Sequence, residues 1–317
     1  MSASAPPALP VKDFLSILDI STGHLRRLLE VAVRLKAERR LGERAPTAHA
    51  LGGAHVALLF EKPSLRTRST FEIGVRELGG HTLDLPREFA EGTREPLEDV
   101  ARNLERWVRA LVIRTYAHEK ARTFAGATKA LHVINALSDA EHPCQALADM
   151  LTLVERWGTC HGRTLAYVGD GNNVATSLVH AAPQLGMSVH VATPAGYELP
   201  PAVVHDAMRL AQGGAQIRTF TDAHEAVSGA DAIYTDVWTS MGQEQEAKAR
   251  RRIFHPFQVN EALMRAARPG ALFMHCLPAH RGEEVTADVF ESASSVVFDQ
   301  AENRLHTQKA LLLMILG

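Results

Sequence analysis

The chain has few cysteines and few aromatic side chains. Among its 317 residues only 3 are cysteine, and Phe, Trp and Tyr together make up 6%. The cysteines are Cys144, Cys160 and Cys276, and their wide spacing forms neither a disulfide framework nor a CxxC pair of metal ligands. Such sparse, unpaired cysteine is typical of a reducing compartment. We therefore expect a cytoplasmic protein.

An excess of charge and a long apolar run are also missing. The 34 Lys and Arg residues are balanced by 36 Asp and Glu residues, so the net charge is −2. This balance provides no broad basic surface for nucleic acid or an anionic membrane, and any anion site must be local. The apolar stretch 311–316 is too short to span a bilayer. Residues 1–10 lack the basic and apolar segments of a targeting peptide.

The chain does contain a regular alternation of short apolar runs with helical periodicity, and 46% of its residues are hydrophobic. This alternation predicts right-handed βαβ units and parallel sheets, and hence an α/β fold. The predicted strands are 54–60, 81–85, 110–115, 132–136, 163–169, 188–193, 215–220, 232–236, 271–277 and 295–299. Amphipathic stretches at 97–108, 145–157, 173–185 and 201–211 predict helices between them.

Ten strands in two groups predict two doubly wound parallel-sheet domains joined by interdomain helices. We expect the first domain at 1–150 and the second at 151–302. The predicted helix that begins at His142-Pro143 carries the chain between them, because Pro is favoured in the first turn of a helix. A final apolar helix, about 303–317, is expected to pack back on the first domain.

The first candidate site is the segment Ser64-Leu65-Arg66-Thr67-Arg68, which follows a predicted strand and opens a predicted helix. The N–H groups of a helix start and the positive end of its dipole attract anions. Arginine adds a fork of donors that matches the edge of a phosphate group. We interpret the segment as a phosphate-binding loop, with Arg68 equally suited to a structural ion pair.

Two further positions at predicted strand ends strengthen this interpretation. Arg114 ends the apolar run 111–113, where a cation needs an anionic partner to offset its desolvation. His142 and Gln145 are three residues apart and therefore share one face of a helix start. An imidazole and an amide at this spacing suit a planar CO–NH2 group. One histidine beside Cys144 does not make a zinc site, so we expect no metal.

The second half of the chain also places polar residues after its strands. Gly169-Asp170-Gly171-Asn172-Asn173 resembles a dinucleotide loop, but Val174 occupies the third glycine position and the next strand does not end on an acid. Asn173 instead suits a small ligand or a helix N-cap. Asp236 ends an apolar strand and suits an ammonium partner, or else an Asx-turn. Cys276 follows His275 on the opposite face of a strand, so His275 is a poor base for a cysteine nucleophile.

Seven motifs in order resemble the aspartate/ornithine carbamoyltransferase superfamily, and ornithine carbamoyltransferases in particular. They are Ser64-Leu65-Arg66-Thr67-Arg68, Arg114-Thr115, His142-Pro143-Cys144-Gln145, Gly169-Asp170-Gly171-Asn172-Asn173, Asp236-Val237-Trp238-Thr239-Ser240-Met241-Gly242, His275-Cys276-Leu277-Pro278 and Ala301-Glu302-Asn303-Arg304. The resemblance covers about residue 12 to the end of the chain. It implies a carbamoyl-phosphate domain followed by an ornithine domain, a homo-oligomer that is a trimer or a multiple of one, and no cofactor.

The resemblance also implies roles for individual residues. Carbamoyl phosphate would be bound by Ser64, Leu65, Arg66, Thr67, Arg114, His142, Gln145, Cys276, Leu277 and Arg304. Ornithine would be bound by Asn173, Asp236, Ser240 and Met241. Arg66, Arg114, His142 and Cys276 would take part in catalysis, and His81 would reach a neighbouring subunit's site. Leu65 departs from the threonine usual in this family, so only a backbone contact is expected from it.

The implied reaction is transfer of a carbamoyl group from carbamoyl phosphate to the side-chain amine of L-ornithine, giving citrulline and phosphate in arginine synthesis or the reverse in its breakdown. Three alternatives remain open at this point. The acceptor could be putrescine, an N-acylated ornithine or aspartate. The chain could instead be a nicotinamide dehydrogenase, which Val174 disfavours. It could also be a non-catalytic sensor of a phosphate metabolite, which the intact set of polar residues disfavours.

Overall fold

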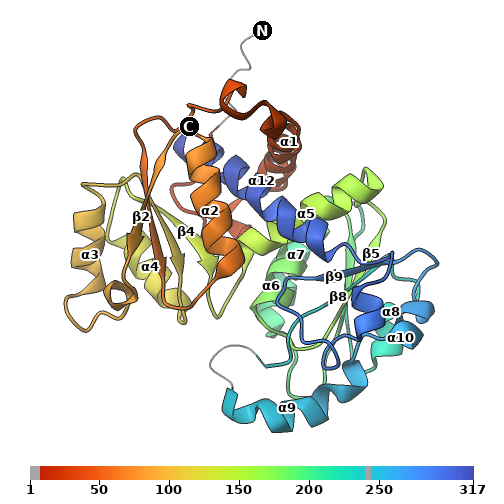
Figure 1. Ribbon diagram of the computed structural model, residues 1–317. Coiled ribbons are helices and arrows are strands. Elements are labelled where there is room, and N and C mark those ends of the chain that lie inside the picture. The colour runs from red at the N-terminus through yellow and green to blue at the C-terminus, as the bar shows by residue number, and fades with distance from the viewer. Residues whose placement is uncertain (1–7, 240–243) are drawn as a thin grey trace. The chain divides into compact units, whose positions relative to one another are not determined.

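A computed structural model describes residues 8–239 and 244–317 (Figure 1). The chain forms two compact units, each with its own parallel sheet. The first unit contains residues 1–151 and 302–317, and the second contains residues 152–301. Two helices, α5 (Pro143–Trp157) and α12 (Val297–Leu316), carry the chain from one unit to the other. The predicted α/β class with two parallel sheets is confirmed.

The first unit is built on a four-stranded parallel sheet in the order β2-β1-β3-β4. Its strands are β1 (His55–Phe60), β2 (His81–Leu85), β3 (Ala110–Arg114) and β4 (His132–Leu137). All residues of β3 are buried, whereas the edge strand β2 is largely exposed. Strand β3 beside β1 is the centre of the sheet, and its carboxyl end delivers Arg114.

Helices cover both faces of this sheet. They are α1 (Thr22–Glu38), α2 (Leu65–Glu77), α3 (Leu97–Leu104), α4 (His118–Gly126), and the parts of α5 and α12 that belong to this unit. Alternate side chains of β1, Ala57 and Leu59, pack with α3 and α4 in one hydrophobic core. Gly74 of α2 allows α12 to approach closely, because a Cβ there would lie 3.1 Å from Lys309.

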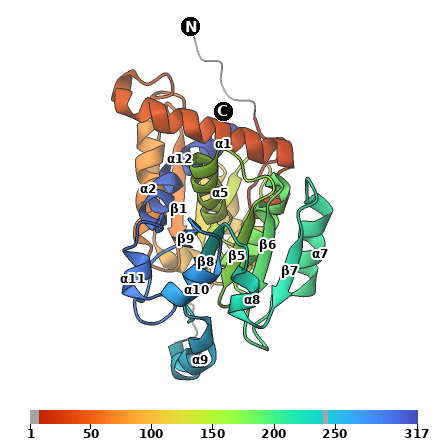
Figure 2. The same cartoon turned by 90° about the vertical axis from the view of Figure 1, so that its right-hand side faces the viewer.

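The second unit has a five-stranded parallel sheet in the order β7-β6-β5-β8-β9. Its strands are β5 (Thr164–Val168), β6 (Ser188–Ala192), β7 (Ile217–Phe220), β8 (Ala232–Thr235) and β9 (Leu272–His275). Its helices are α6 (Asn173–Ala181), α7 (Pro201–Leu210), α8 (Ala223–Val227), α9 (Ala247–Phe254), α10 (Glu261–Ala266) and α11 (Ala287–Phe290). Figure 2 shows the five strands next to one another in this order. A core that includes residues of β5, α8 and α10 fills one face.

Two predictions need correction. The apolar run 295–299 is not a strand, because α12 begins at Val297 and only Ser295 forms an isolated bridge, with Phe273. The predicted helix 173–185 ends at Ala181, and Pro183 begins a short 3-10 turn instead. Proline lacks the N–H that would continue the helical hydrogen bonds, which explains the break.

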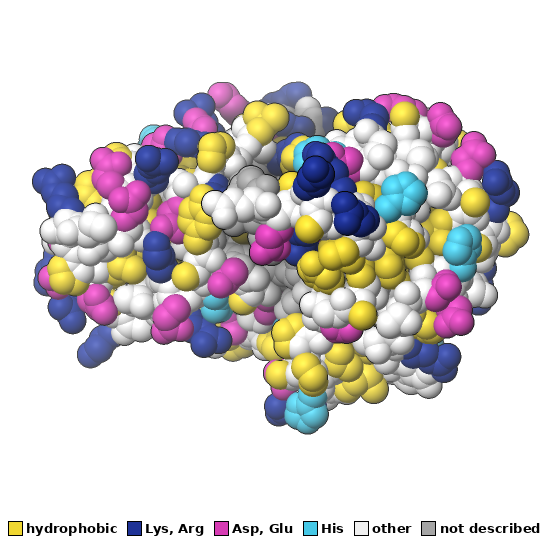
Figure 3. Space-filling model, turned by 90° about the horizontal axis from the view of Figure 1, so that it is seen from below, with side chains coloured by type: hydrophobic (Ala, Val, Ile, Leu, Met, Phe, Trp, Pro, Cys, Tyr) yellow, Lys and Arg dark blue, Asp and Glu magenta, His cyan; other side chains and the backbone are white. Residues whose placement is uncertain are grey.

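Acidic and basic side chains are interspersed on the face drawn in Figure 3, with no wide area of one sign. Among the described residues, no helix has both the length and the apolar character needed to cross a membrane.

Candidate active site

In the first unit, the carboxyl ends of β1 and β3 bring two predicted site residues together. Ser64 is the residue that precedes α2, and its side chain makes no capping hydrogen bond to that helix. Its Oγ instead accepts a hydrogen bond from Nη1 of Arg114, the last residue of β3, at 3.0 Å. Arg114 is only 8% exposed. A nearly buried guanidinium therefore lies at the positive end of a 13-residue helix.

The loop before α2 is shaped by a buried carboxylate. Glu61 accepts hydrogen bonds from the Thr115 hydroxyl at 2.5 Å and from the Tyr116 N–H at 2.8 Å, and it also pairs with Lys120. Lys62 lies 3.6 Å from the centre of the Tyr116 ring. These contacts tie the chain after β1 to the chain after β3, which fixes the position of Ser64 relative to Arg114.

A second network in the same unit joins α2, α5 and α12. Arg304 is 2% exposed and donates to Gln145 Oε1 at 2.7 Å and to Thr67 Oγ1 at 2.5 Å. Gln145 in turn donates through Nε2 to Asp149 Oδ1 at 2.8 Å. Arg304 thus joins two other predicted residues, Thr67 and Gln145, that are far from it in the sequence.

His142 belongs to the same cluster. Burial, with the positive charges of Arg304 and Arg114, holds the pKa of His142 well below its usual value of 6.5. The charge of Arg66 acts in the same direction. The imidazole is therefore neutral near pH 7, with one ring nitrogen as a donor and the other as an acceptor.

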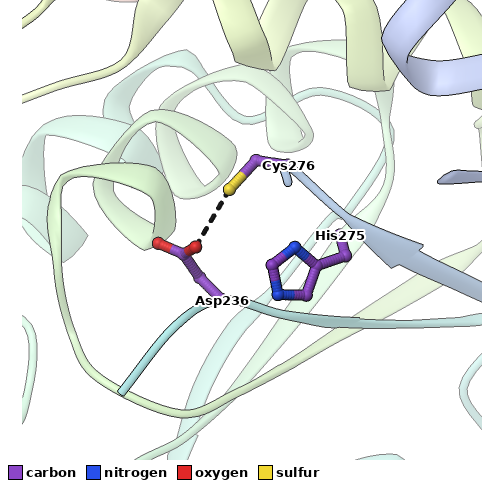
Figure 4. Close-up of side chains that lie close together, drawn as sticks. All are labelled: Asp236, His275 and Cys276. Atoms are coloured by element: carbon purple, nitrogen blue, oxygen red, sulfur yellow. Dashed lines mark hydrogen bonds between the residues drawn. The ribbon is translucent and has the colours of Figure 1, made fainter. Parts of the chain in front are cut away.

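In the second unit, the ends of β8 and β9 bring Asp236 and Cys276 together (Figure 4). The Cys276 thiol donates to Asp236 Oδ1 at 3.0 Å, and Asn172 donates to Asp236 Oδ2 at 2.8 Å. Asn172 is the N-cap of α6, where its Oδ1 accepts the N–H groups of Val174 and Ala175. The nearby Asp236 and Asp170 carboxylates add to burial in raising the pKa of Tyr167 well above its usual value. The carboxylates of Asp236 and Asp170 therefore make the electrostatic potential around Tyr167 negative.

Asp236, His275 and Cys276 lie close enough together to suggest a metal site. Both ring nitrogens of His275 are already used, however. Its Nδ1 accepts the Leu277 N–H at 2.8 Å, so the proton resides on Nε2, which lies 3.1 Å from Glu284 Oε1. His275 therefore supports the turn after β9 and is not oriented as a ligand or as a base for Cys276. The turn itself places Leu277 at a φ of 60°, a strained conformation for a residue with a side chain.

Arg250 of α9 contacts the first part of the loop after β8. Arg250 is 3% exposed, pairs with Asp170 after β5, and donates through Nε to the Trp238 carbonyl at 2.5 Å. Its guanidinium also lies 4.8 Å from the centre of the Tyr197 ring. Burial raises the pKa of Asp170, and the charge of Arg250 opposes that rise. A buried ion pair thus connects α9 to the loop that carries Asn172.

The remaining predicted residues have varied surroundings. Leu65 is 78% exposed in the first turn of α2, and Arg68 pairs with Asp84, as its structural interpretation predicted. His81 begins the exposed strand β2, with its ring 5.3 Å from that of His55. The N-cap interpretation of Asn173 is wrong, because Asn172 holds that position. Ser240 and Met241 lie outside the described residues.

Sequence reasoning missed three supporting residues. They are Asp149, Arg250, and Asn172 as a hydrogen-bond donor to Asp236. Asp149 had a detectable signal, because it lies four residues after Gln145 and so on the same face of α5. Arg250 had a weaker signal, because it lies four residues before the apolar Phe254 on the same face of α9.

Comparison with known proteins identifies the class. Residues 12–155 match the family model of the carbamoyl-phosphate-binding domain of aspartate/ornithine carbamoyltransferases, and residues 161–315 match that of the Asp/Orn-binding domain. The chain therefore belongs to the aspartate/ornithine carbamoyltransferase family.

Its relatives narrow the class further. The ornithine carbamoyltransferase of Anoxybacillus flavithermus is 49% identical over the full length of both chains. That of Geobacillus stearothermophilus is also 49% identical, over 99% of this chain and 100% of its own. The solved structure of the Pyrococcus furiosus ornithine carbamoyltransferase is 46% identical and superposes with a TM-score of 0.92, covering 99% of each chain.

Proposed function

We propose that this protein is an ornithine carbamoyltransferase, which transfers the carbamoyl group of carbamoyl phosphate to the δ-amine of L-ornithine and releases citrulline and phosphate. The observation that carries the proposal is the contact between Arg114 and Ser64 at the start of α2. It provides a guanidinium beside helix N–H groups, as an activated phosphate requires. The relatives named above support the choice of ornithine, and nothing among them favours putrescine or an N-acylated ornithine.

The first unit is proposed to bind carbamoyl phosphate. Arg66, Thr67, Ser64 and the Leu65 backbone would bind the phosphate group at the start of α2. Arg114 and His142 would contact the carbonyl oxygen, and Gln145 the NH2 group. The full proposed set is Ser64, Leu65, Arg66, Thr67, Arg114, His142, Gln145, Cys276, Leu277 and Arg304. The set contains three arginines, of which Arg114 and Arg304 are nearly buried, and this positive charge suits a dianionic donor.

The second unit is proposed to bind ornithine. Asp236 supplies a carboxylate for an ammonium group, and its hydrogen bonds from Asn172 and Cys276 hold both of its oxygens in place. Asn173, Ser240 and Met241 complete the proposed set. Cys276 acts by position, because its thiol hydrogen bonds to Asp236 and His275 is not available as a base.

The reaction needs no cofactor. The lone pair of the neutral δ-amine attacks the carbonyl carbon, and the negative charge moves to the carbonyl oxygen of a tetrahedral intermediate. Arg114, Thr67 and His142 stabilise that oxyanion, and Arg66 stabilises the phosphate as the C–O bond breaks. The departing phosphate accepts the proton of the amine. Binding two substrates in reactive alignment supplies much of the rate.

The assembly is proposed to be a homotrimer, or a multiple of one, in the cytoplasm, with His81 reaching a neighbouring subunit's site. Exposed apolar side chains on α2 and β2 support an interface on the first unit. They are Leu65, Ile73 and Leu83, which are 78%, 40% and 39% exposed. Light scattering after gel filtration should give a mass near three times 34.6 kDa or a multiple of that value. No binding of nucleic acid or membranes is expected.

A side-by-side assay tests the activity. The purified protein is incubated with carbamoyl phosphate and ornithine, putrescine or N-acetylornithine, and the carbamoylated product and phosphate are both measured. Citrulline and phosphate should form in equal amounts, with ornithine favoured strongly over the other amines. A faster reaction with putrescine would reassign the acceptor. If no amine gave a carbamoylated product, the proposed activity would be refuted.

A further inference from the structure

The amide of Gln145 has only one chemically reasonable orientation. Its two ends face opposite kinds of partner: Arg304 lies 2.7 Å from Oε1, and Asp149 lies 2.8 Å from Nε2. A guanidinium can only donate hydrogen bonds and an ionised carboxylate can only accept them. Turning the amide over would place its NH2 group against Arg304 and its oxygen against Asp149, so that both hydrogen bonds would be lost.

The burial of these three side chains makes the wrong orientation of the Gln145 amide costly. Gln145 and Asp149 are 1% and 0% exposed, and Arg304 is 2% exposed. Water cannot easily replace a lost partner at such positions, and each mismatched buried polar group costs about 1–3 kcal/mol. Charge-assisted hydrogen bonds are also stronger than neutral ones. Asp149 lies one helical turn beyond Gln145 on α5, so the helix itself sets the spacing.

We infer that Asp149 is a positioning residue that makes Gln145 present its oxygen, an acceptor, to the NH2 group of the donor substrate. This inference rests on the proposed binding of carbamoyl phosphate. A glutamine free to rotate could donate through its NH2 group to a carbonyl oxygen or accept through its oxygen from an NH2 group. Fixed by Asp149 and Arg304, it selects a carbamoyl group over an acyl group that carries a methyl in place of the amine.

Acetyl phosphate is the matching probe, because it keeps the phosphate and the carbonyl of carbamoyl phosphate but has a methyl group where the NH2 would lie. The measured quantities are the KM for carbamoyl phosphate and the Ki of acetyl phosphate as a competitor. In the Asp149→Asn variant, we expect the KM to rise about tenfold and the Ki to change less than twofold, as loss of one charge-assisted hydrogen bond implies. A purely structural defect would weaken both ligands equally, and that result would overturn the inference.

A double variant provides the rescue. In Gln145→Glu with Asp149→Asn, the residue at 145 accepts and the residue at 149 donates, so an acceptor oxygen again faces the site with the same total charge. The preference for carbamoyl phosphate over acetyl phosphate should return to within about threefold of the wild type. If the single variant fails to fold, the double variant alone tests the inference. Loss of its preference for carbamoyl phosphate over acetyl phosphate would then contradict the inference.

Two controls separate this inference from the proposed function. Glu77→Gln removes a carboxylate from an ion pair with Lys309 in the same unit and should change neither constant. The wild type must release citrulline in the same assay. A wild type without citrulline would refute the proposed function, whereas an active wild type with equal losses in Asp149→Asn would refute only the role of Asp149.

Discussion

The two units share an architecture but differ in the charge that they collect at the ends of their strands. In the first unit, Arg114 and Arg304 are nearly buried, and their positive charges add to burial in lowering the pKa of His142. In the second unit, burial raises the pKa of Tyr167, and the negative charges of Asp236 and Asp170 add to that rise. One doubly wound scaffold therefore builds a cationic site and an anionic site. The difference matches substrates of opposite charge, an acyl phosphate and an alkyl ammonium.

The two sites also differ in how their charges are compensated. In the first unit, the arginines donate hydrogen bonds to neutral acceptors, namely Ser64, Thr67 and Gln145. In the second unit, Arg250 and Asp170 form a largely buried ion pair near the carboxylate of Asp236. We expect substitutions in the first site to affect mainly function, and those in the buried pair to affect mainly stability.

The largest effect is expected from removing charge at the first site. Arg66→Ala should lower kcat/KM for carbamoyl phosphate by about 10³, because the developing phosphate charge loses its partner. The melting temperature should stay unchanged. Arg76→Ala, at the exposed far end of the same helix, is the matched control and should have near-normal kinetics. Near-normal kinetics in Arg66→Ala would remove the assigned role.

Breaking the buried pair of the second unit should give the next largest effect. Arg250→Met leaves Asp170 buried without its cation, which should reduce the free energy of unfolding by about 3 kcal/mol. Urea unfolding followed by fluorescence measures the change. Arg265→Met breaks the exposed pair with Glu261 and should cost no more than about 0.5 kcal/mol. Equal stabilities for the two variants would contradict the proposed contrast between the units.

Removing the charge of Asp236 in the second site should weaken the binding of ornithine but not that of carbamoyl phosphate. Asp236→Asn should raise the KM for ornithine about 100-fold while the KM for carbamoyl phosphate changes little, because only the ammonium loses a charged partner. Asp288→Asn, an exposed carboxylate of the same unit, serves as the control. A parallel rise of both KM values would show that Asp236 supports the fold and not the acceptor.

The pH dependence of kcat/KM for ornithine should reflect the ionisation of the ornithine amine alone. Because the pKa of His142 is lowered, its imidazole stays neutral from about pH 6.5 upward and does not titrate in the working range. The amine of ornithine, with an ordinary pKa of about 10.4, must lose a proton to attack. We expect kcat/KM for ornithine to rise about tenfold per pH unit between pH 6.5 and 8.5. A flat profile would contradict attack by a free amine.

Local signals predicted much of this structure. Strand β1 and helix α2 were predictable because an apolar run is followed at once by a polar segment with helical continuation. The failure at 295–299 has a clear cause: Val297 has strand propensity, but it begins α12 and packs in the core of the second unit. Propensity cannot foresee such tertiary effects. Helix α1 was also missed, although Ser21 caps it and its apolar residues recur at helical spacing.

Candidate ligands were predictable where a reactive side chain follows a strand, as with Arg114 and Asp236. The signals of their supporting residues were weaker. Asp149 and Arg250 are charged residues within helices, where charge usually indicates a solvated face. Only the structure shows them to be buried and paired.

One binding measurement tests the contrast between the two sites most directly. A compound that joins a phosphonoacetyl group to the δ-nitrogen of ornithine carries the charges of both substrates, and its Kd can be measured by titration calorimetry without turnover. We predict tight binding by the wild type and a loss of at least about 100-fold in both Arg66→Ala and Asp236→Asn. Undiminished affinity in either variant would contradict the assignment of one substrate charge to each unit.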